Sequence, residues 1–343
     1  MHDYRMVSVG IIGASGFTGT ELLRLSAAHP DLNVRIATGD TQAGSRAAEL
    51  YPSLAAAYPS LVYRAYDPAE VAGMDLVFLG LPHGASQALV PDLIGKVGHI
   101  VDLAADFRLQ DAALYPQWYG EAHTAPELLS HFAYGLPELF RPEILAATHV
   151  ATPGCYPTAA ALALAPLTRA GVIDPGGIIV DAASGVSGAG RSPKPSTTFC
   201  TVDEDFTAYG LLDHRHTPEM EQVLGATVLF TPHLAPMNRG ILATCYARPT
   251  GSTSTTALLD ILRHAYAAEP FVVVTETSPS TKATLGSNCA HVTARYDPRS
   301  GYVLAIAALD NITKGASGAA VQCANLLLGL PETTGLPIAG VYP

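Results

Sequence analysis

The sequence predicts a doubly wound α/β domain with a parallel sheet, followed by an α+β domain whose larger sheet is mostly antiparallel or mixed. Three observations predict this fold class. The chain has 343 residues, which exceeds the size of one ordinary hydrophobic core. Apolar strand-like runs alternate with helical runs in the first half, as they do in parallel sheets. After about residue 155 most runs are strand-like, and longer pieces separate them.

Hydrophobic runs place the elements of the first domain. A strand-like run at 6–12 ("MVSVGII") precedes a helical run ("TGTELLRLSAAHP"), and a second strand-like run follows at 33–38. Two further strand-like runs lie at 74–82 and 98–107, with the helical "ASQALVPDLIGKV" between them. Strands that alternate with helices in this way favour βαβ units.

The second domain is predicted to consist mainly of strands. The strand-like runs are "GGIIVDAASGV", "ATVLFTPHLAP", "GILATCYARPT", "FVVVTET" and "YVLAIAALDN", and the final "GASGAAVQCANLLLGL" is helical. The chain shows no internal repeat and no low-complexity linker.

Charge and composition exclude several classes of function. The formal net charge of -11 disfavours nucleic acids and anionic membranes as partners, because both require a basic face. A small anionic substrate needs only a local cluster of arginines and is not excluded. The start, "MHDYRMVSVGIIG", does not have the pattern of a signal peptide, and the longest apolar run, "TAAALALAPL", is too short to span a bilayer.

The cysteines predict a reduced, cytoplasmic protein. Five of them, at 155, 200, 245, 289 and 323, lie far apart with no C-x-x-C pair. An odd, scattered set does not fit a disulfide framework or a zinc site.

A glycine-rich loop follows the first strand-like run. In "VGIIGASGFTG" the glycines are Gly10, Gly13, Gly16 and Gly19, and the loop opens the first helix. Close backbone approach and amides at a helix N-terminus suit the pyrophosphate of a dinucleotide. The alternative is a tight turn in which glycine only relieves crowding.

The residues after the second strand leave NAD and NADP open. Asp40 lies near the strand end, where a carboxylate binds the ribose 2′-hydroxyl of NAD. Thr38, Ser45 and Arg46 offer an alternative site for the 2′-phosphate of NADP.

Cys155 lies in "ATPGCYPTAA", between a strand-like run and an alanine-rich helix. With Pro157 in the first helical turn, the cysteine falls at or just before the helix N-terminus. The helix dipole favours a thiolate there and an oxyanion formed when the sulfur attacks a carbonyl. The alternative is a buried cysteine that packs as a small hydrophobe.

Two histidines are candidates for the base beside this thiol. "DHRHTPEMEQ" contains His214 and His216, with Thr217 as the expected helix cap, Pro218 as the first helical residue and Glu219 in the first turn. A histidine ahead of a helix is well placed for proton transfer. Metal ligation and plain surface histidines are the alternatives, and no further metal ligands flank the pair.

Three arginines lie in segments that suit an anion. "SGVSGAGRSPKP" at 184–195 combines small residues with Arg191. In "APMNRGIL" Arg239 lies on a predicted turn before a strand, and in "LAADFRL" Arg108 follows a strand. With a thiolate and a dinucleotide loop, they indicate an anionic, phosphorylated substrate. The alternatives are a flexible loop at 184–195 and solvated or structural arginines.

The segment "DNITKGASGAAVQ" places Lys314 and Gly315 at the start of the last helix. This helix end either contacts phosphate or nicotinamide, or only caps the helix.

Six segments resemble N-acetyl-γ-glutamyl-phosphate reductases of arginine biosynthesis. They are "GIIGASGFTGTELLRL", "ATPGCYPTAA", "SGVSGAGR", "HRHTPEM", "FTPHLAPMNRGIL" and "DNITKGASGAAVQCAN". The resemblance runs in order from about residue 6 to about residue 335. The strings "PGCYPTA" and "HRHTPE" together are highly specific to this family.

The resemblance implies a Rossmann domain plus an α+β catalytic domain. The expected division is an NADP-binding domain of 1–153 with 316–343, and a catalytic and oligomerisation domain of 154–315. The implied reaction is NADPH-dependent reduction of N-acetyl-γ-glutamyl phosphate to N-acetyl-L-glutamate 5-semialdehyde with release of phosphate. The implied cofactor is NADP(H), and the implied assembly is a homodimer or homotetramer.

The resemblance also implies roles for individual residues. Cys155 forms a thioester, His216 is the acid–base residue and His214 positions or contacts the substrate. The expected substrate-binding residues are Arg108, Ser184, Gly185, Arg191 and Arg239. The expected cofactor-binding residues are Gly10, Gly13, Ser15, Gly16, Phe17, Thr18, Thr38, Ser45, Pro82, His83, Asn311 and Lys314.

Three other functions remain open. The first is a sister reductase that acts on a carrier-protein-bound aminoadipyl or glutamyl phosphate, which the net acidity of the chain disfavours. The second is aspartate-semialdehyde dehydrogenase, which lacks the strings "PGCYPTA" and "HRHTPE". The third is a non-catalytic dinucleotide-binding protein, in which Cys155 is unreactive.

Overall fold

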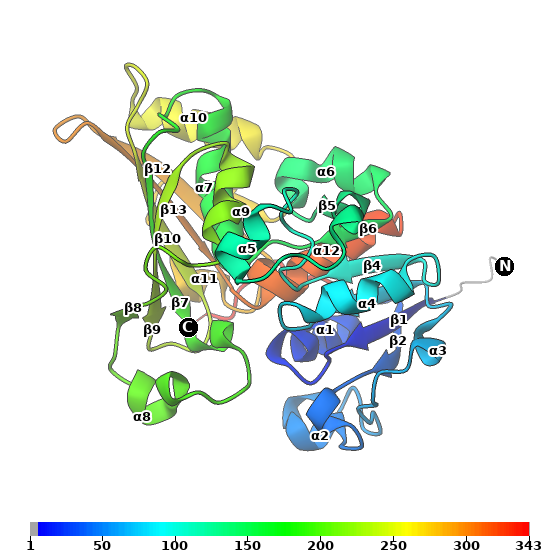
Figure 1. The fold of residues 1–343 in the computed structure, drawn as a ribbon. Coiled ribbons are helices and arrows are strands. Elements are labelled where there is room, and N and C mark those ends of the chain that lie inside the picture. Colours follow the sequence, from blue (N-terminus) through cyan, green and yellow to red (C-terminus); the bar gives the residue numbers. More distant parts are fainter. Residues whose placement is uncertain (1–5, 343) are drawn as a thin grey trace. The chain divides into compact units, whose positions relative to one another are not determined.

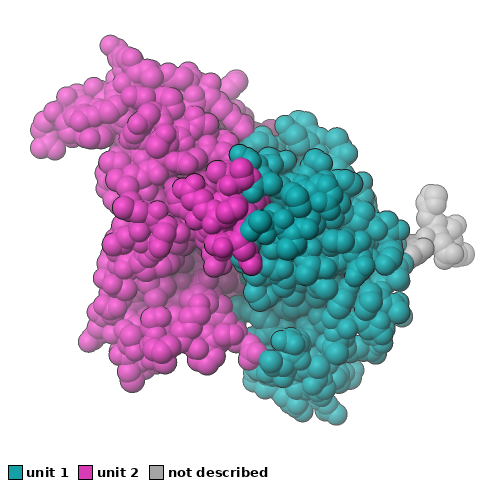
Figure 2. Space-filling model, in the orientation of Figure 1, with its two compact units in different colours: residues 1–112, 122–153, 316–336 teal, residues 113–121, 154–315, 337–343 magenta. Residues whose placement is uncertain are grey.

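Two β-sheets organise residues 6–342, the part of the chain that the computed structural model describes, with one sheet in each of two units (Figures 1 and 2). Unit 1 contains the described residues up to 112, together with 122–153 and 316–336. Unit 2 contains 113–121, 154–315 and 337–342.

Unit 1 has a parallel sheet. Within its described residues, six strands lie in the order β2-β1-β3-β4-β6-β5, and each neighbouring pair is parallel. The predicted parallel α/β domain is therefore confirmed. The strands are β1 (Val7–Ile12), β2 (Leu32–Ala37), β3 (Leu76–Leu79), β4 (His99–Asp102), β5 (Phe132–Tyr134) and β6 (His149–Ala151).

The last helix of the chain belongs to unit 1, where it packs on α1, α6 and β4. The hydroxyl of Ser317 donates to the carbonyl of Thr18 at 2.8 Å, and Nε2 of His29 lies 2.9 Å from Oδ1 of Asn325. These bonds join the C-terminal helix to the first helix of the unit. The helices of unit 1 are α1 (Phe17–Ala28), α2 (Ala47–Leu50), α3 (Pro68–Val71), α4 (Ala85–Leu93), α6 (Pro137–Ala146) and α12 (Gly318–Leu327).

Unit 2 has a mixed sheet. In its described part, seven strands follow the order β11-β12-β13-β10-β7-β9-β8. The pairs β11–β12 and β7–β9 are parallel, and the other four pairs are antiparallel. The predicted α+β domain is confirmed. The strands are β7 (Ile178–Gly185), β8 (Thr207–Ala208), β9 (Val228–Ala235), β10 (Ile241–Ala247), β11 (Val272–Val274), β12 (Ala290–Asp297) and β13 (Tyr302–Leu309).

Helix α7 covers one face of this sheet, where it packs on β10, β12 and β13 and against α9 and α10. Residues 156–167 of α7 are all buried, which explains a helix that is apolar on every side. On the opposite face, the alternate residues of β10 remain half-buried. The helices of unit 2 are α5 (Leu114–Tyr119), α7 (Cys155–Arg169), α8 (Phe199–Val202), α9 (Thr217–Leu224), α10 (Thr255–Ala265) and α11 (Thr281–Thr284).

Two segments that the sequence assigned to the first domain cluster with unit 2 instead. Residues 113–121 include α5, in which the hydroxyl of Tyr119 donates to the carbonyl of Arg215 at 3.4 Å. Residues 337–342 run along the loop after α11, where the amide of Val341 donates to the carbonyl of Leu285 at 2.7 Å. Each segment is thus bonded to residues of unit 2. Among residues 6–342, no helix has the length and apolar character needed to cross a membrane.

The turn between β1 and α1 requires glycine at two positions. Gly13 has a φ of +84°, and a Cβ there would lie 2.4 Å from the carbonyl oxygen of Gly80, just after β3. A Cβ at Gly19 would lie 2.4 Å from the carbonyl oxygen of Gly13. The bare backbone therefore lets the turn pack closely between β3 and α1.

We expect Gly13→Ala to lower the thermal midpoint of unfolding more than Gly73→Ala. The two glycines have similar φ values, +84° and +80°, so each alanine costs about 1–2 kcal/mol in the left-handed region. The added Cβ meets backbone only at Gly13, because no described atom lies within 4 Å of its position at Gly73. Equal midpoints in thermal unfolding would show that the turn does not depend on this close approach.

Candidate active site

The glycine-rich turn of unit 1 ends at the N-terminus of α1. Gly16 is the N-terminal cap of this helix, so the amides of Phe17 and Thr18 lie in its first turn and have no acceptor within the helix. Thr38, at the end of β2, accepts a hydrogen bond from the amide of Gly13 at 3.1 Å. These features suit a phosphate group, because helix N-terminal amides bind anions.

Gly10 does not belong to this turn. It lies inside β1, where it pairs with Ile36 of β2 and Val77 of β3. Gly10 therefore belongs to the sheet, and its contact with a cofactor stays a prediction.

The segment after β2 carries both signs of charge at the surface. Asp40 begins a short 3-10 turn, and Arg46 is exposed a few residues later. The hydroxyl of Ser45 donates to the carbonyl of Gln42 at 2.7 Å, which closes the loop between them. Both the carboxylate that suits NAD and the arginine that suits NADP thus lie in one short loop.

The turn after β3 contains Pro82 and His83 and is held by a buried carboxylate that the sequence did not reveal. Nδ1 of His83 lies 2.5 Å from Oδ1 of Asp106, and the amides of Gly84 and Gln87 donate to Asp106 at 2.8 and 3.0 Å. Burial alone would raise the pKa of Asp106, but these hydrogen bonds outweigh it and lower the pKa. Pro82 is exposed on this turn.

Arg108 is buried inside unit 1, where its side chain bonds to the backbone of two segments. Its Nε donates to the carbonyl of Thr152, and its Nη2 donates to the carbonyl of Leu103, both at 2.8 Å. Only 7% of the residue is exposed. The guanidinium therefore supports the end of β6 directly before Pro153.

Cys155 is the first residue of α7, and Gly154 is its N-terminal cap. The amide and hydroxyl of Thr158 both donate to the carbonyl of Gly154 at 3.0 Å, which closes the first turn. The thiol is half-buried and not part of a disulfide. A thiol at the N-terminus of a 15-residue helix has its thiolate stabilised by the helix dipole.

Glu219 holds this helix start from another helix. Its carboxylate is fully buried, and Oε1 accepts the amide of Gly154 at 2.8 Å. A Cβ at Gly154 would lie 2.4 Å from Nε2 of His216, so the imidazole lies directly against the backbone before Cys155. The sequence showed Glu219 only as a residue of the first helical turn, with no signal for this contact.

The cap of α9 is one residue earlier than the sequence predicted. The helix begins at Thr217, and His216 occupies the cap position without a side-chain capping bond. Thr217 is therefore helical and Pro218 is the second helical residue. The shift places the imidazole of His216 at the helix boundary.

His214 packs in an aromatic cluster beside His216. Its Nδ1 accepts the amide of His216 at 3.1 Å, and its ring meets those of Tyr156, Tyr209 and Phe230 edge to face at centroid distances of 5.7, 5.6 and 5.2 Å. Burial lowers the pKa of His214 to about 4. The ring is therefore neutral at pH 7.

Two tyrosines that the sequence did not single out extend this cluster. The hydroxyl of Tyr156 lies 3.1 Å from that of Tyr209 and donates to the carbonyl of His233 at 3.1 Å. Burial raises the pKa of Tyr209 to about 12, and a negative charge on Cys155 contributes to the rise. Both phenols are thus neutral beside the thiol.

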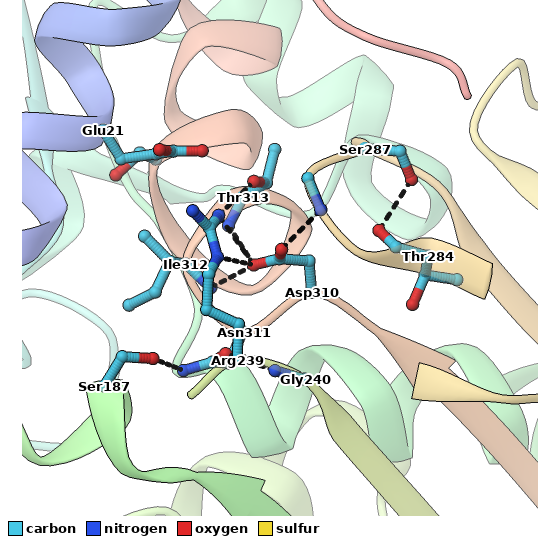
Figure 3. A network of polar contacts seen from close by, with 12 residues as sticks. Glu21, Ser187, Arg239, Gly240, Thr284, Ser287, Asp310, Asn311, Ile312 and Thr313 are labelled. Atoms are coloured by element: carbon cyan, nitrogen blue, oxygen red, sulfur yellow. Dashed lines mark hydrogen bonds and ion pairs between the residues drawn. The ribbon is translucent and has the colours of Figure 1, made fainter. Parts of the chain in front are cut away.

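The expected substrate-binding residues of unit 2 fall into two groups. Ser184 and Gly185 end β7, and a Cβ at Gly185 would lie 2.7 Å from the amide of Arg239. Ser184, Gly185 and Arg239 therefore form the first group. Figure 3 shows the guanidinium of Arg239 bonded to Asp310 and Thr313. Arg191 lies in a separate half-buried position, where no described carboxylate pairs with it.

The side chains of Asn311 and Lys314, both predicted to bind the cofactor, are buried. Oδ1 of Asn311 accepts the amide of Gly240 at 2.7 Å, and its Nδ2 donates to Ser187 at 3.0 Å. Lys314 is fully buried, with Nζ 5.6 Å from the centroid of the Phe271 ring. The two bonds of Asn311 join it to the turns at Gly240 and Ser187, and the cofactor contacts of both residues stay predictions.

Gly315 brings the turn after β13 against the cysteine. A Cβ at this position would lie 2.8 Å from Cβ of Cys155. The site in unit 2 thus combines a thiol at a helix N-terminus, an imidazole and an arginine. A thiolate and a proton-transfer group in this arrangement suit nucleophilic attack on an acyl carbon. Among residues 6–342, no three His, Cys, Asp or Glu side chains gather to hold a metal ion.

Two family models match this chain. The one described as "Semialdehyde dehydrogenase, NAD binding domain" matches residues 8–147, and the one described as "Semialdehyde dehydrogenase, dimerisation domain" matches residues 155–311.

Curated relatives match over nearly the full chain. A protein of Symbiobacterium thermophilum named N-acetyl-gamma-glutamyl-phosphate reductase is 50% identical, over 98% of this chain and 99% of its own. A protein of the same name from Citrifermentans bemidjiense is 46% identical, over 98% of this chain and 100% of its own.

Solved structures share the fold at low identity. Aspartate semialdehyde dehydrogenase II of Vibrio cholerae, complexed with ASA, has a TM-score of 0.70 at 15% identity and covers 94% of this chain and 98% of its own. The aspartate semialdehyde dehydrogenase of Candida albicans with NADP has a TM-score of 0.69 at 14% identity and covers 94% and 99%. At this identity the likeness shows the fold alone.

We expect Glu219→Ala to destabilise the protein by about 1–3 kcal/mol, because it leaves the buried amide of Gly154 without its acceptor. Glu219→Gln retains a carbonyl oxygen at the same place and is the matched control. Thermal unfolding compares the two. If Glu219→Gln proved as unstable as Glu219→Ala, the charge of Glu219 rather than its bond to Gly154 would matter.

We expect His214 to titrate near pH 4 rather than near 6.5, since burial disfavours its charged form. The pKa in the folded state lies below that of the unfolded chain. The stability that the neutral ring contributes is therefore complete above about pH 6.5 and is lost as the pH falls towards 4. NMR titration of the histidine rings, with His214→Gln to assign the resonance, measures the midpoint. A midpoint near 6.5 would contradict the burial of this ring.

Proposed function

The chain belongs to the N-acetyl-γ-glutamyl-phosphate reductase family, and we propose that it reduces N-acetyl-γ-glutamyl phosphate to N-acetyl-L-glutamate 5-semialdehyde with NADPH in arginine biosynthesis. The observation that carries the proposal is the placement of Cys155 at the start of α7, with His216 against Gly154. This is the arrangement that a thioester mechanism requires.

Unit 1 holds the cofactor in this proposal. The turn at Gly13, which a Cβ would fill, and the first-turn amides of α1 fit the pyrophosphate. The choice between NADP and NAD depends on the segment after β2. We assign the binding of the 2′-phosphate of NADP to Thr38, Ser45 and Arg46 in this segment. The turn of Pro82 and His83 lines the same cofactor site. When bound, NADPH supplies the hydride that reduces the thioester.

Cys155 is the nucleophile. Its thiolate attacks the acyl carbon, the bond from that carbon to the phosphate oxygen breaks, and inorganic phosphate leaves. The N-terminus of α7 stabilises both the thiolate and the oxyanion on the acyl oxygen. His216 accepts the proton of the thiol. The oxyanion that hydride addition leaves at the thioester carbon collapses to the aldehyde as the carbon–sulfur bond breaks, and His216 returns its proton to the departing sulfur of Cys155.

His214 is a positioning residue. Its neutral Nδ1 accepts the backbone amide of His216, and the aromatic rings around it fix its orientation. Arg239, Ser184 and Gly185 hold the anionic groups of the substrate from the ends of β7 and β10. Arg191 reaches the substrate from the loop after β7. Arg108 supports the backbone before Pro153 within unit 1.

Besides its substrate and cofactor, the chain binds further copies of itself in this proposal. The half-buried face of the sheet in unit 2 includes Leu242, Tyr246 and Ile306, and Leu229 is 48% exposed on it. An apolar sheet face of this kind fits a homodimer or homotetramer. We also propose a cytoplasmic location, because a reducing compartment keeps Cys155 as a free thiol.

Cys155→Ser should abolish phosphate-dependent reduction of NADP by N-acetylglutamate semialdehyde, with a loss of about a thousandfold or more, because serine cannot form the thioester efficiently. Cys200→Ser removes an exposed thiol and should leave turnover unchanged. Parallel assays with NAD test the assignment of the loop at Asp40 and Arg46. If wild type failed to turn over this aldehyde, the proposed substrate would be wrong.

A further inference from the structure

A buried polar network lies at the end of β13 and centres on Asp310 (Figure 3). This residue is fully buried. Its Oδ1 accepts Nε and Nη2 of Arg239 at 3.1 and 2.9 Å, and its Oδ2 accepts the amide of Gly286 at 2.7 Å. One carboxylate therefore joins the turn before β10 to the loop after α11.

The same carboxylate shapes the chain that follows it. Oδ1 of Asp310 also accepts the amides of Ile312 and Thr313 at 2.9 and 3.0 Å. These bonds begin a π-helical turn over Thr313–Ser317, in which the carbonyl of Asp310 accepts the amide of Gly315 at 2.9 Å. Such turns are rare and occur frequently at functional sites.

This π-helical turn packs against the nucleophile. A Cβ at Gly315 would lie 2.8 Å from Cβ of Cys155 and 3.2 Å from its Cα. The position of the turn therefore bounds the space around the first residue of α7.

Arg239 shares Oδ1 of Asp310 with the amides of Ile312 and Thr313. The hydroxyl of Thr313 accepts Nη2 of Arg239 at 2.7 Å, and 24% of the arginine side chain remains exposed. The guanidinium is thus oriented before a ligand arrives, which reduces the ordering that anion binding requires.

We propose that Asp310 is a positioning residue for the reaction, which orients Arg239 towards the substrate anion and holds the turn of Gly315 against Cys155. Its role in turnover rests on the function proposed above. Asp310 contacts neither reactant in this scheme. It acts through Arg239 and through the backbone of residues 312–315, which bond to the same carboxylate oxygen.

Asp310→Asn tests the role in substrate binding. Asparagine keeps the size of the side chain but loses the charge. It also places an NH2 group, a donor, beside the N–H groups that donate to the carboxylate of Asp310. We expect the KM values for the semialdehyde and for phosphate to rise about tenfold or more, with the KM for NADP within about twofold of wild type. Ser287→Ala is the matched control. Its buried hydroxyl donates to the carbonyl of Thr284 in the neighbouring turn, away from Arg239, so its KM values should stay at wild-type levels.

A double-mutant cycle separates positioning from general loosening. If Asp310 acts through Arg239, Asp310→Asn should have little further effect on the KM values in an Arg239→Lys background. Additive effects would overturn the proposal, as would wild-type KM values in a folded Asp310→Asn or an equal rise in the KM for NADP.

If Asp310→Asn does not fold, Thr313→Val removes one bond to Nη2 of Arg239 and should raise the KM values for the semialdehyde and for phosphate about threefold. Unchanged values would then overturn the proposal.

Alkylation of Cys155 by iodoacetamide provides a readout that needs no substrate. We expect the alkylation rate of Asp310→Asn to differ from that of wild type by about threefold or more, because the turn of Gly315 loosens beside the thiol. An unchanged rate would overturn this part of the proposal. Absence of turnover in wild type would refute the proposed function instead, and the alkylation result would still decide whether Asp310 positions the turn.

Discussion

The candidate site depends on the hydrogen bond from the amide of Gly154 to the buried carboxylate of Glu219. Gly154 caps α7 and Glu219 lies in the first turn of α9, so this bond ties together the N-termini of two helices. His216, the cap of α9, then lies where a side chain at 154 would be. The imidazole lies against the residue before Cys155 because the bond holds both helix starts together, and a side chain at position 154 would clash with it.

Buried carboxylates stabilise other irregular turns of the chain in the same way. Asp106 accepts two backbone amides in the turn of His83, and Asp310 accepts three in the turns of Gly286 and Thr313. Turns at strand ends leave amides without a partner in a helix or sheet, and a buried amide without an acceptor is costly. A charged acceptor satisfies several amides at once and thereby fixes the backbone that carries the functional side chains.

The alternation of strand-like and helical runs predicted the parallel sheet, because its strands are continuous in apolar residues. β3 (Leu76–Leu79) is an example, since it is buried throughout. The same criterion missed β12 (Ala290–Asp297), whose sequence "AHVTARYD" carries polar residues on the half-buried side of the sheet. It also missed β5 (Phe132–Tyr134), which has only three residues. Pairing with a neighbouring strand, rather than local hydrophobicity, decides these two elements.

Within the site, predictability follows the distance in sequence between partners. The place of Cys155 at a helix N-terminus follows from its neighbours in "PGCYP", so the sequence predicts it. Glu219 and Gly154 are 65 residues apart, and Arg239 and Asp310 are 71 apart, so no local pattern reveals either pair. Lys314 shows the converse: its place at a helix start is local, but the burial of its side chain beside Phe271, 43 residues away (314 − 271), is not visible in the local sequence. Local chemistry therefore identifies the reactive groups, and contacts between distant segments decide which side chains support them.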